Sequence, residues 1–566
     1  MKRQQRHQQG RRSITLGAGI MVFAVLASAL AGCKSGLTEN PSAPLEQNSQ
    51  TEAILEESLE SSQIPLEDMT VLLEPEDEYT IWDEKSSVMI NLDDSKITID
   101  GQGATANGST VTIEKSGTYV LKGALSDGTI LVDAEKNDTV RLVFNGVDIH
   151  SELSAPVDIK KAGKTIISLE EGSVNSLSDS SGLIYRDEEK EEPNGALFSK
   201  GDLTINGSGT LKVDGTFNNG ICSKDVLKIV GGTFLVTAAN HGVKGNDALV
   251  IYDGQMTISA AGDGIKSDTL AAILGGEILV SECEEGIEAE TVVIRGGTID
   301  LTASDDGINA STDGTNAPQI YFMGGTVTVR AEGDGIDSNG SIEMSGGQIT
   351  VYGPSERDNG AIDYDREFNL TGGTIMAFGP GGMEQNVSSS ESQVSVLADF
   401  GETLAAGTAV TLRDSDGNEL CAGTGERDFK TVVITVPEMT AGSQYEIQAG
   451  EHVITFVPEQ TIVYVNKDGV QEAAAMGPGR GGPGGREGGT NGGREGLPSE
   501  RPESPQGRMS GGREGQPPER PELSESGMNG GREGLPSERP EPPQDGEGGK
   551  MPEGMEDSQI EKDGQQ

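Results

Sequence analysis

Short runs of alternating apolar and polar residues fill the chain between Val88 and Leu177. Three of them read "KITIDG", "STVTIEKSGTYVLKG" and "KTIISLEEG", and Gly, Asp or Asn separates each run from the next. A period of two places every second side chain on the same face of a β-strand, and no helical period competes with it in this region. The pattern therefore predicts many short strands joined by turns.

From residue 195 onwards, strands of this kind recur in units that are each marked by one glycine. The marker glycines are Gly195, Gly220, Gly242, Gly264, Gly286, Gly307, Gly335 and Gly360. Spacings of 21 to 28 residues between them are typical of a solenoid. A leucine-rich repeat has a similar period, but its leucine and asparagine signature is absent. We expect the marker glycine to allow a tight corner with a positive φ.

Aligned on these glycines, the large apolar residues fall into columns. The first column contains Ile221, Val243, Ile265, Ile287, Ile308 and Ile336, and the second contains Ile229, Ile251, Ile273, Ile294, Phe322, Met344 and Leu370. A third strand in each unit adds two apolar positions, such as Phe234 and Val236. Three short strands per unit predict a parallel β-helix, in which each unit is one coil and each column is a ladder in the core. Parallel crossovers favour a right-handed winding.

The predicted fold class is all-β: a right-handed parallel β-helix, or solenoid, with a small C-terminal β-domain or cap and disordered N- and C-terminal segments. Residues 79–390 form the solenoid, and residues 391–466 lose the repeat but keep strand patterns, which predicts the small β-domain or cap. Residues 33–78 are rich in Glu, Ser, Pro and Gln and predict a flexible stalk. Residues 467–566 are rich in Gly, Pro, Glu and Arg, so we expect a disordered tail.

The first residues have the order of an export signal. A basic segment is followed by an apolar run from Ile14 to Ala31 and by "LAGC" from Leu30 to Cys33. This order resembles a bacterial lipoprotein signal, which implies removal of residues 1–32 and a lipid on Cys33. A plain membrane helix is the alternative, but the run is short and ends at a cysteine. We therefore expect the protein at the extracellular face of the cell membrane, held to the membrane through the lipid on Cys33.

The composition is strongly acidic. The 566 residues include 92 Asp and Glu against 42 Lys and Arg, which gives a formal net charge of −50. Such a charge excludes nucleic acid as a reasonable partner, because phosphates are repelled, and it favours cations or ligands bridged by cations. Beyond Cys33, the three cysteines Cys222, Cys283 and Cys421 have no CxxC spacing and no accompanying histidines, so a zinc site is unsupported.

Acidic residues gather beside the first apolar column. The residues that precede the marker glycines include Asp263, Glu285, Asp306 and Asp334, and those that follow the apolar column include Glu288, Asn309 and Asp337. In the last unit the register slips by one residue, so that Asp363 takes the equivalent place. The corresponding positions of the earlier units are Asn219, His241, Cys222, Lys244 and Lys266.

A column of carboxylates in a solenoid points to calcium. Neighbouring coils lie about 4.8 Å apart, so stacked carboxylates repel each other unless a cation lies between them. Calcium accepts oxygen ligands at roughly 2.3 to 2.6 Å in flexible geometry, and the acidic units supply no His or Cys for a softer metal. The alternative is that Asp-Gly and Asn-Gly occur in turns for conformational reasons and that their side chains face water.

Several non-repeating strings carry a family resemblance. The stretch "GTYVLKGALSDGTILVDAEKNDTVRLVFNGVDI", then "EEPNGALFSKGDLTINGSGTLKV" and the "DGI" coils, resembles the carbohydrate-binding β-helix lipoproteins of clostridia and related bacteria over about residues 90 to 465. The resemblance implies a right-handed β-helix similar in shape to pectate lyases, with bound calcium, that adheres to polygalacturonate and cellulose. It also implies these calcium-binding residues: Glu285, Glu288, Asp306, Asn309, Asp334, Asp337 and Asp363.

Three functions remain open from the sequence. The first, which we favour, is a surface-tethered, non-catalytic polysaccharide-binding protein in which calcium bridges protein and uronate carboxylates. The second is a polysaccharide lyase, whose base would come from a set of basic residues: Arg330, Arg357, Arg366, Lys244 and Lys266. The third is a structural stalk or adhesin. We expect Tyr252, Tyr321 and Tyr352 to point outward, at different strand positions that support a stacking strip for sugars only weakly.

Overall fold

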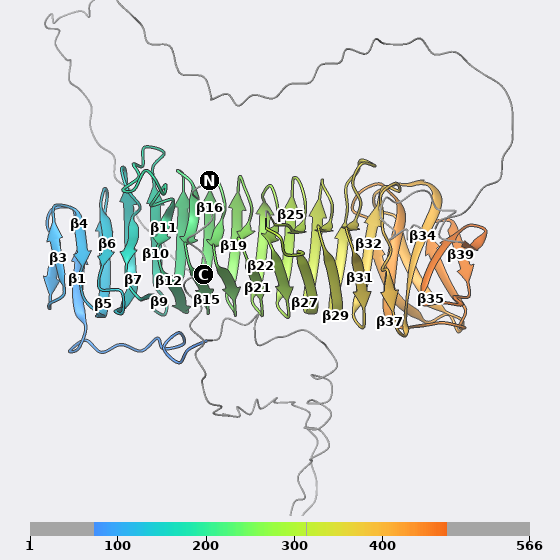
Figure 1. Cartoon of the computed structure of the whole chain (residues 1–566), viewed down its shortest axis with the longest axis horizontal. Helices are drawn as coiled ribbons and strands as arrows, with labels where there is room; N and C mark the ends of the chain where they lie inside the picture. Colours follow the sequence, from blue (N-terminus) through green and yellow to red (C-terminus); the bar gives the residue numbers. More distant parts are fainter. Residues whose placement is uncertain (1–72, 313, 472–566) are drawn as a thin grey trace, which may run out of the picture. The chain divides into compact units, whose positions relative to one another are not determined.

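The structure is a computed structural model that describes residues 73–312 and 314–471, all within one compact unit. Every regular element in these residues is a β-strand. The strands wind into a parallel β-solenoid of about 11 turns, so the predicted all-β solenoid fold is confirmed. Figure 1 shows the coils following one another in a single row, from the first strands in blue to the last in orange.

One strand from each coil contributes to a 12-stranded sheet. Its strands are parallel, except for the antiparallel pair of the first two. In order they are β3 (Ala104–Asn107), β4 (Thr110–Ile113), β6 (Thr129–Asp133), β8 (Val157–Lys161), β11 (Gly195–Ser199), β14 (Asn219–Ser223), β17 (Val243–Gly245), β20 (Ile265–Lys266), β23 (Ile287–Ala289), β26 (Ile308–Ala310), β28 (Ile336–Ser338) and β30 (Ile362–Tyr364).

The other two strands of each coil belong to a larger sheet of 25 strands. The second strands are β9 (Lys164–Leu169), β12 (Asp202–Gly207), β15 (Val226–Ile229), β18 (Ala248–Ile251), β21 (Leu270–Ile273), β24 (Thr291–Ile294) and β31 (Glu367–Leu370). The third strands are β10 (Val174–Asp179), β13 (Thr210–Gly215), β16 (Thr233–Ala238), β19 (Gln255–Ala260), β22 (Glu277–Glu282), β25 (Thr298–Ala303) and β32 (Thr374–Gly379). Four longer strands cover both positions: β5 (Gly117–Leu125), β7 (Thr139–Ser151), β27 (Gln319–Ala331) and β29 (Ser341–Tyr352).

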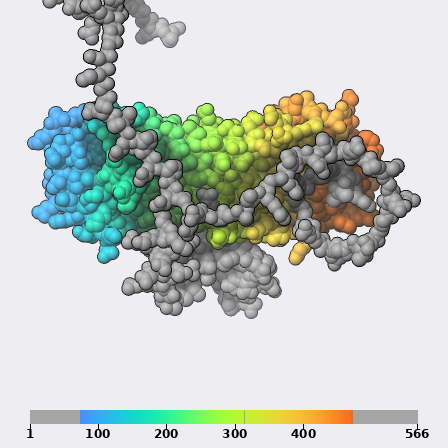
Figure 2. Space-filling view, turned by 45° about the horizontal axis from the view of Figure 1, so that its top comes forward, coloured from blue at the N-terminus to red at the C-terminus, as the bar shows by residue number. Residues whose placement is uncertain are grey.

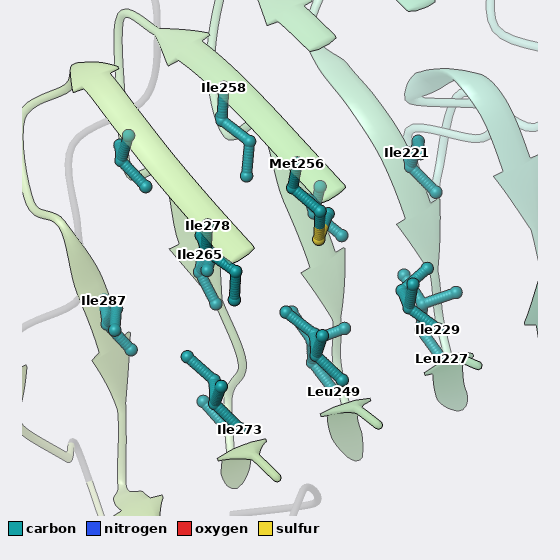
Figure 3. Close-up of a cluster of buried hydrophobic side chains, with 14 of the residues drawn as sticks. Ile221, Leu227, Ile229, Leu249, Met256, Ile258, Ile265, Ile273, Ile278 and Ile287 are labelled. Carbon is teal, nitrogen blue, oxygen red and sulfur yellow. The ribbon is translucent and has the colours of Figure 1, made fainter. Parts of the chain in front are cut away.

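The predicted apolar columns are ladders in the core. Ile265 pairs with Val243 on one side and Ile287 on the other, and all three side chains are fully buried. The second column runs in the same way along the second strands. Figure 3 shows these side chains pointing into the space that the coils enclose. Each buried Ile contributes about 1.5–3 kcal/mol, so the ladders are the main stabilising feature of the solenoid.

The marker glycines are needed for a reason that we did not predict. None of the six from Gly220 to Gly335 has a positive φ. A positive φ occurs instead in the turn before the third strand, at the second glycine of pairs such as Gly275-Gly276 (Gly276, φ 92°). At Gly335, a Cβ atom would lie 2.2 Å from Val351 Cγ1 and 2.5 Å from the carbonyl oxygen of Ala361. The marker glycine therefore permits close approach between coils rather than an unusual backbone conformation.

The alignment of the first marker glycine was also wrong by one residue. Gly195 pairs with Asn219, and Leu197, not Ala196, pairs with Ile221. At the other end of the repeat, Ile336 pairs with Ile362 and Asp337 pairs with Asp363. The one-residue slip predicted for the last unit is therefore confirmed.

Beyond the last coil, the sheet changes direction. β32 pairs antiparallel with β37 (Phe429–Thr440), which ends the parallel ladder and leaves no open sheet edge at this point. The other strands added to the large sheet are β1 (Val88–Leu92), β2 (Thr98–Asp100), β33 (Ser389–Ser390), β34 (Gln393–Leu404), β40 (Ile462–Asn466) and β41 (Gly469–Gln471). A separate four-stranded antiparallel sheet contains β36 (Glu419–Thr424), β35 (Ala409–Asp414), β38 (Tyr445–Ala449) and β39 (His452–Phe456).

This C-terminal part has a hydrophobic core, separate from that of the coils, to which the last coil also contributes side chains. Met376 and Phe378 of β32 pack with Phe429 and other buried residues of β34 to β40. Figure 2 shows the C-terminal part, in orange, following the coils without a break. The arrangement agrees with the predicted small β-domain or cap.

Before β1, residues 73–87 form a segment that we call the N-terminal strap. Its Asp77 is fully buried, and its carboxylate lies 2.6 Å from Lys164 Nζ and 2.9 Å from Lys228 Nζ. Thr204 Oγ1 donates a hydrogen bond of 2.7 Å to the same carboxylate. Burial acts to raise the pKa of Asp77, but the two lysines lower it to about 2. Residues 73–78, which we had predicted to be the end of the flexible stalk, therefore already pack on the solenoid.

The predicted signal peptide (residues 1–32), the lipid attachment at Cys33, most of the stalk and nearly all of the tail lie outside the described residues. Among the described residues, no helix is long and apolar enough to span a membrane.

Candidate metal site

The candidate site lies at the corner where the third strand of one coil leads into the short strand of the next. The short strands β20, β23, β26, β28 and β30 stack in parallel, and this brings one residue of each into register. The resulting column runs through Lys266, Glu288, Asn309, Asp337 and Asp363. Residues far apart in the chain are therefore neighbours along one edge of the solenoid.

Three carboxylates form the tightest group in this column, and we call them the acidic triad: Asp334, Asp337 and Asp363. One oxygen atom of each lies within 4.8 Å of the others, and all three side chains are half-buried. Asp334 and Asp337 belong to the same turn, and Asp363 comes from the next coil. Two atoms that bind one calcium ion at roughly 2.3 to 2.6 Å lie at most about 5 Å apart, so the triad has the size of a calcium site.

Neighbouring groups already hold part of the triad in place. Asp334 Oδ1 accepts a hydrogen bond of 2.5 Å from the backbone N–H of Gly360, and Asn339 Nδ2 donates a bond of 3.1 Å to Asp337 Oδ2. Gln385 Nε2 donates to Asp363 Oδ1. One oxygen of each carboxylate is therefore oriented by the protein, which leaves the second oxygen of each for a cation.

The triad shows the electrostatic cost of placing carboxylates together. Burial, together with repulsion from Asp306 and the other triad members, raises the pKa of Asp337 to about 8. Burial raises the pKa of Asp334 to about 7, although its hydrogen bond from Gly360 acts in the opposite direction. Without a cation, these groups keep protons near neutral pH. A divalent ion would replace those protons.

A second group, which we call the lysine-paired cluster, lies in earlier coils and contains Asp263, Glu285 and Glu288. Its ligand atoms also lie within 4.8 Å of one another. In contrast to the triad, it contains a protein cation: Lys266 Nζ contacts Glu288 Oε2 and lies 3.3 Å from Asp263 Oδ2. His241 Nδ1 lies 3.1 Å from the same Asp263 oxygen. Lys266 therefore already neutralises part of the charge that calcium would neutralise.

The sequence prediction missed Asp263 as a member of this cluster. Asp263 is only 5% exposed, and although burial acts to raise its pKa, His241 and Lys266 lower it overall. Its position directly before Gly264 was the available signal, but the basic residues of that coil argued against it. Glu285 in the same cluster has its pKa raised to about 7 by burial and by repulsion from Asp263.

Asp306 and Asn309 lie between the two groups and have different roles. Asp306 Oδ1 accepts a hydrogen bond of 2.6 Å from the backbone N–H of Asp334, so it caps the next turn. Asn309 is 7% exposed and donates a bond of 3.2 Å from Nδ2 to Glu285 Oε1. Asn309 Oδ1 and Glu285 Oε2 are buried oxygens with no hydrogen-bond partner among the described residues.

Calcium fits the groups present. Every side chain of the triad and Asn309 offers oxygen, which is the ligand that calcium prefers. Within residues 73–312 and 314–471, the buried oxygens Asn309 Oδ1 and Glu285 Oε2 have no hydrogen-bond partner, which is costly unless a further group satisfies them. The alternative is that acidic residues occur at these turns only for conformational reasons. It accounts for Asp306, whose carboxylate caps a backbone N–H. It does not account for the triad, whose side chains are half-buried and do not simply face water. That the predicted residues bind calcium stays a prediction.

Comparisons with known proteins identify the family. A model of the family described as "Carbohydrate-binding domain-containing protein" matches residues 107–352 and 270–418, which together span more than half of the chain. The chain belongs to this family. A curated protein of the same description from Acetivibrio thermocellus is 39% identical over 150 residues, which are 26% of this chain and 52% of that protein. The match thus covers about half the length of the relative.

One solved structure is also similar to this carbohydrate-binding domain protein. It is described as the polysaccharide lyase-like protein from C. thermocellum in a gadolinium derivative. The sequence identity is 33%, and the match covers 46% of this chain and 96% of the other. A TM-score of 0.38 is too low to support an argument about the fold or the site.

Three basic residues near the column of this carbohydrate-binding domain protein are engaged in ion pairs. Lys244 Nζ lies 2.9 Å from Asp268 Oδ1, and Lys266 belongs to the lysine-paired cluster. Arg330 pairs with Asp300 and with Glu426, and the hydrogen bonds that it donates to Glu426 raise the pKa of Arg330. A cation that is held by carboxylates keeps its proton more firmly, which makes it a weaker general base.

The outward tyrosines do not form one platform. Tyr352 stacks on Phe378 of the last coil with ring centroids 5.5 Å apart, whereas Tyr252 and Tyr321 pack on a different face. A shallow hollow of about 360 Å³ instead lies on the outward face of the third strands. Lys212, Asp214, Leu235, Thr237, Thr257 and Ser259 contribute to its lining. The hollow lies on β10, β13, β16 and β19, in coils that precede the acidic triad.

The raised pKa values predict how the stability of this carbohydrate-binding domain protein depends on pH. Unfolded aspartates have pKa values of about 4, so between that value and about 8 the metal-free folded protein binds more protons than the unfolded chain. Its stability should therefore fall as the pH rises through this window. In chelator, we expect the melting temperature to be a few degrees higher at about pH 5.5 than at about pH 8.5.

The measurement is thermal unfolding across this pH range, in EDTA and in excess calcium. Calcium should remove most of the decline because it stabilises the ionised carboxylates. A melting temperature in chelator that rises steadily up to about pH 8.5 would contradict the proton binding that we assign to Asp334 and Asp337.

Proposed function

We propose that this protein is a lipid-anchored, non-catalytic polysaccharide-binding protein that uses calcium to hold plant cell-wall polymers, with polygalacturonate as the main ligand and cellulose as the second. Membership of the carbohydrate-binding domain family supports the ligand class. The observation that carries the calcium part is the acidic triad, in which oxygens from two successive coils lie within 4.8 Å of one another.

Calcium solves an electrostatic problem for this chain. A protein with a formal net charge of −50 repels a polymer of uronate residues. A calcium ion held by Asp334, Asp337 and Asp363 would leave coordination sites for carboxylate and hydroxyl oxygens of the sugar. The parallel coils repeat the adjoining outward face at about 4.8 Å intervals, which suits a long polymer better than a small molecule.

The same proposal assigns secondary roles to the remaining predicted ligands. Glu285, Glu288 and Asn309 would hold a second, weaker calcium ion, because Lys266 competes for Glu288. Asp306 would support the site by fixing the backbone of Asp334. The anchor is the lipid on Cys33, which would place the solenoid at the extracellular face of the membrane.

The alternative function for the same surface is that of a polysaccharide lyase. Proton abstraction next to a uronate carboxylate needs a free base near the cation. Lys244, Lys266 and Arg330 are each held by carboxylates, which favours binding over catalysis. Arg366 is exposed and follows the triad closely in the chain, so it is the residue to replace if lyase activity is found.

Retention on insoluble polysaccharides tests the proposal. The full-length chain should be retained by polygalacturonate coupled covalently to beads and by cellulose in calcium, and the retention on polygalacturonate should be lost in EDTA. The supernatants are assayed at the same time for unsaturated sugars by ultraviolet absorbance. Release of these sugars would show that the protein is a lyase rather than a non-catalytic binding protein. Absence of retention on both polymers would leave the structural stalk as the remaining candidate function.

A further inference from the structure

An apolar patch lies on the outward face of the second strands, away from the acidic corner. It contains Ala248, Val250, Leu270, Ala272 and Val293, with Val226, Tyr252, Leu274, Tyr321 and Met323 packed around it. The alternating residues Leu249 and Ile251 point into the core, so Ala248 and Val250 point outward. In spite of this orientation, Ala248 and Val250 are each 2% exposed. Such low exposure of small outward residues is typical of a sheet face that is covered.

The N-terminal strap ends beside this patch. One outward column of the second strands runs through Thr204, Lys228, Val250, Ala272 and Val293. Asp77 of the strap is bound to the first two members, Thr204 and Lys228. The apolar members begin at the next coil. The described chain therefore starts, at Leu73, four residues from a contact that adjoins the patch.

We propose that residues 64–72 continue the strap and dock on this apolar patch. The segment reads "IPLEDMTVL" and includes Ile64, Leu66, Met69 and Val71, in a stalk that is otherwise mostly polar. In an extended chain, Met69, Val71 and Leu73 point to the same side, because side chains alternate between two faces. That side would lie on Val250, Ala272 and Val293.

The length of the segment suits the patch. From Lys228 to Tyr321 the column crosses four coil steps, which are about 19 Å at the usual strand spacing. Nine extended residues reach about 30 Å, so residues 64–72 are long enough to cross the patch and extend beyond its far edge. The charge pattern also fits: Asp77 contacts Lys228, the basic member of the column, and Lys164 two coils earlier, and the apolar residues follow where the column is apolar.

Docking of this segment would decide where the tether leaves the solenoid. The stalk would emerge from the face of the second strands, and the acidic corner at the end of the third strands would stay clear of it. This inference does not depend on calcium or on any polysaccharide.

Disulfide trapping in the full-length chain tests the contact directly. We expect the pair Val71→Cys and Ala272→Cys to form a disulfide under mild oxidation, identified by peptide mass spectrometry. The control pair is Val71→Cys with Leu235→Cys, since Leu235 is 42% exposed on the outward face of the third strands. A docked segment raises the effective concentration of the first pair, so its yield should be at least about tenfold higher. Equal yields of the two pairs would overturn the proposal.

A second pair of variants tests whether the disulfide captures only a rarely populated docked conformation. The double variant Met69→Asp and Val71→Asp should increase the binding of a hydrophobic dye and the rate of protease cleavage within residues 60–75. The matched variant Thr70→Asp, which places a charge on the opposite side of the extended segment, should change neither. No difference between these variants would overturn the docking.

Two other occupants of the patch would be recognised by the single variant Ala272→Cys. Disulfide-linked dimers of this variant in solution would place a second copy of the chain there. Protection of the new thiol from labelling by cellulose or polygalacturonate would place a carbohydrate there. Either result overturns the proposal that residues 64–72 occupy the patch.

Discussion

The variant Asp337→Asn should bind calcium about one hundredfold more weakly than the unchanged protein, and its retention on polygalacturonate should be lost with it. Asparagine keeps one oxygen at the position but removes a charge from a group of three carboxylates, and calcium affinity depends strongly on the number of charged ligands. Asp337 stands in register with Asp363 of the next coil, so the change removes one of the two charges that its turn contributes to a site built between two coils. A hundredfold loss corresponds to about 2.7 kcal/mol.

Isothermal titration calorimetry in a buffer at about pH 8.5 is the appropriate measurement, because the raised pKa of Asp337, about 8, otherwise makes calcium compete with a proton. The loss caused by the substitution should be smaller at about pH 6, where the unchanged protein is also protonated at this position. This pH dependence separates the removal of a ligand from a general defect in folding.

The matched control for this variant is Asp247→Asn, which changes the net charge by the same amount at an exposed position before β18. Its calcium affinity and its retention should equal those of the unchanged protein. If both variants lost affinity equally, the acidic surface as a whole, rather than the triad, would attract the cation.

The ladders could be predicted from the sequence because the solenoid repeats one physical requirement in every coil. An inward position in a parallel coil must be apolar and large, and Ile221, Val243 and Ile265 satisfy it at a constant spacing. The marker glycines were recognised by the same repetition, but not their cause. Whether a glycine is needed for a positive φ or for close approach depends on the neighbouring coil, here on Val351 beside Gly335.

The column of the candidate site could also be predicted, since stacked coils place equivalent positions side by side. What the sequence did not reveal was how the charges pair within the column. Lys266 turns toward Glu288 and Asp263, so a cluster of three acids is partly neutralised from within, whereas the next coils offer Asp334, Asp337 and Asp363 without a lysine in register. The direction of a long side chain decides between the two cases, and residue spacing does not encode that direction.

The packing of the N-terminal strap on the solenoid could not be predicted, because its composition is that of an acidic stalk. Glu74, Glu76 and Asp77 read as part of an acidic stalk, yet Asp77 binds Lys228, which is 151 residues away in the chain. A contact of this kind has no local pattern. It is visible only once the coils have placed Lys164 and Lys228 on one outward face, where two buried lysines need a carboxylate.

The variant Gly335→Ala should lower the free energy of unfolding by about 2–3 kcal/mol, because overpacking a close contact between coils forces backbone shifts. A Cβ atom at this position would lie 2.2 Å from Val351 Cγ1 and 2.5 Å from the carbonyl oxygen of Ala361. The carbonyl belongs to the backbone of the next coil, so the clash cannot be relieved by a side-chain rotation alone. The backbone φ of Gly335 is not positive, so conformational strain does not add to the effect.

Urea unfolding followed by far-ultraviolet circular dichroism measures this loss, and Gly182→Ala is its control. Gly182 is exposed, and a Cβ atom there would meet its nearest neighbour, the carbonyl oxygen of Glu152, at an ordinary 3.4 Å. The control should stay within about 0.5 kcal/mol of the unchanged protein. Because Gly335 lies between Asp334 and Ile336, the shift should also separate Asp334 from Asp363 and weaken calcium binding. A stable Gly335→Ala variant with unchanged calcium affinity would show that neighbouring coils can move apart without disturbing the triad, contrary to the close packing that holds the site together.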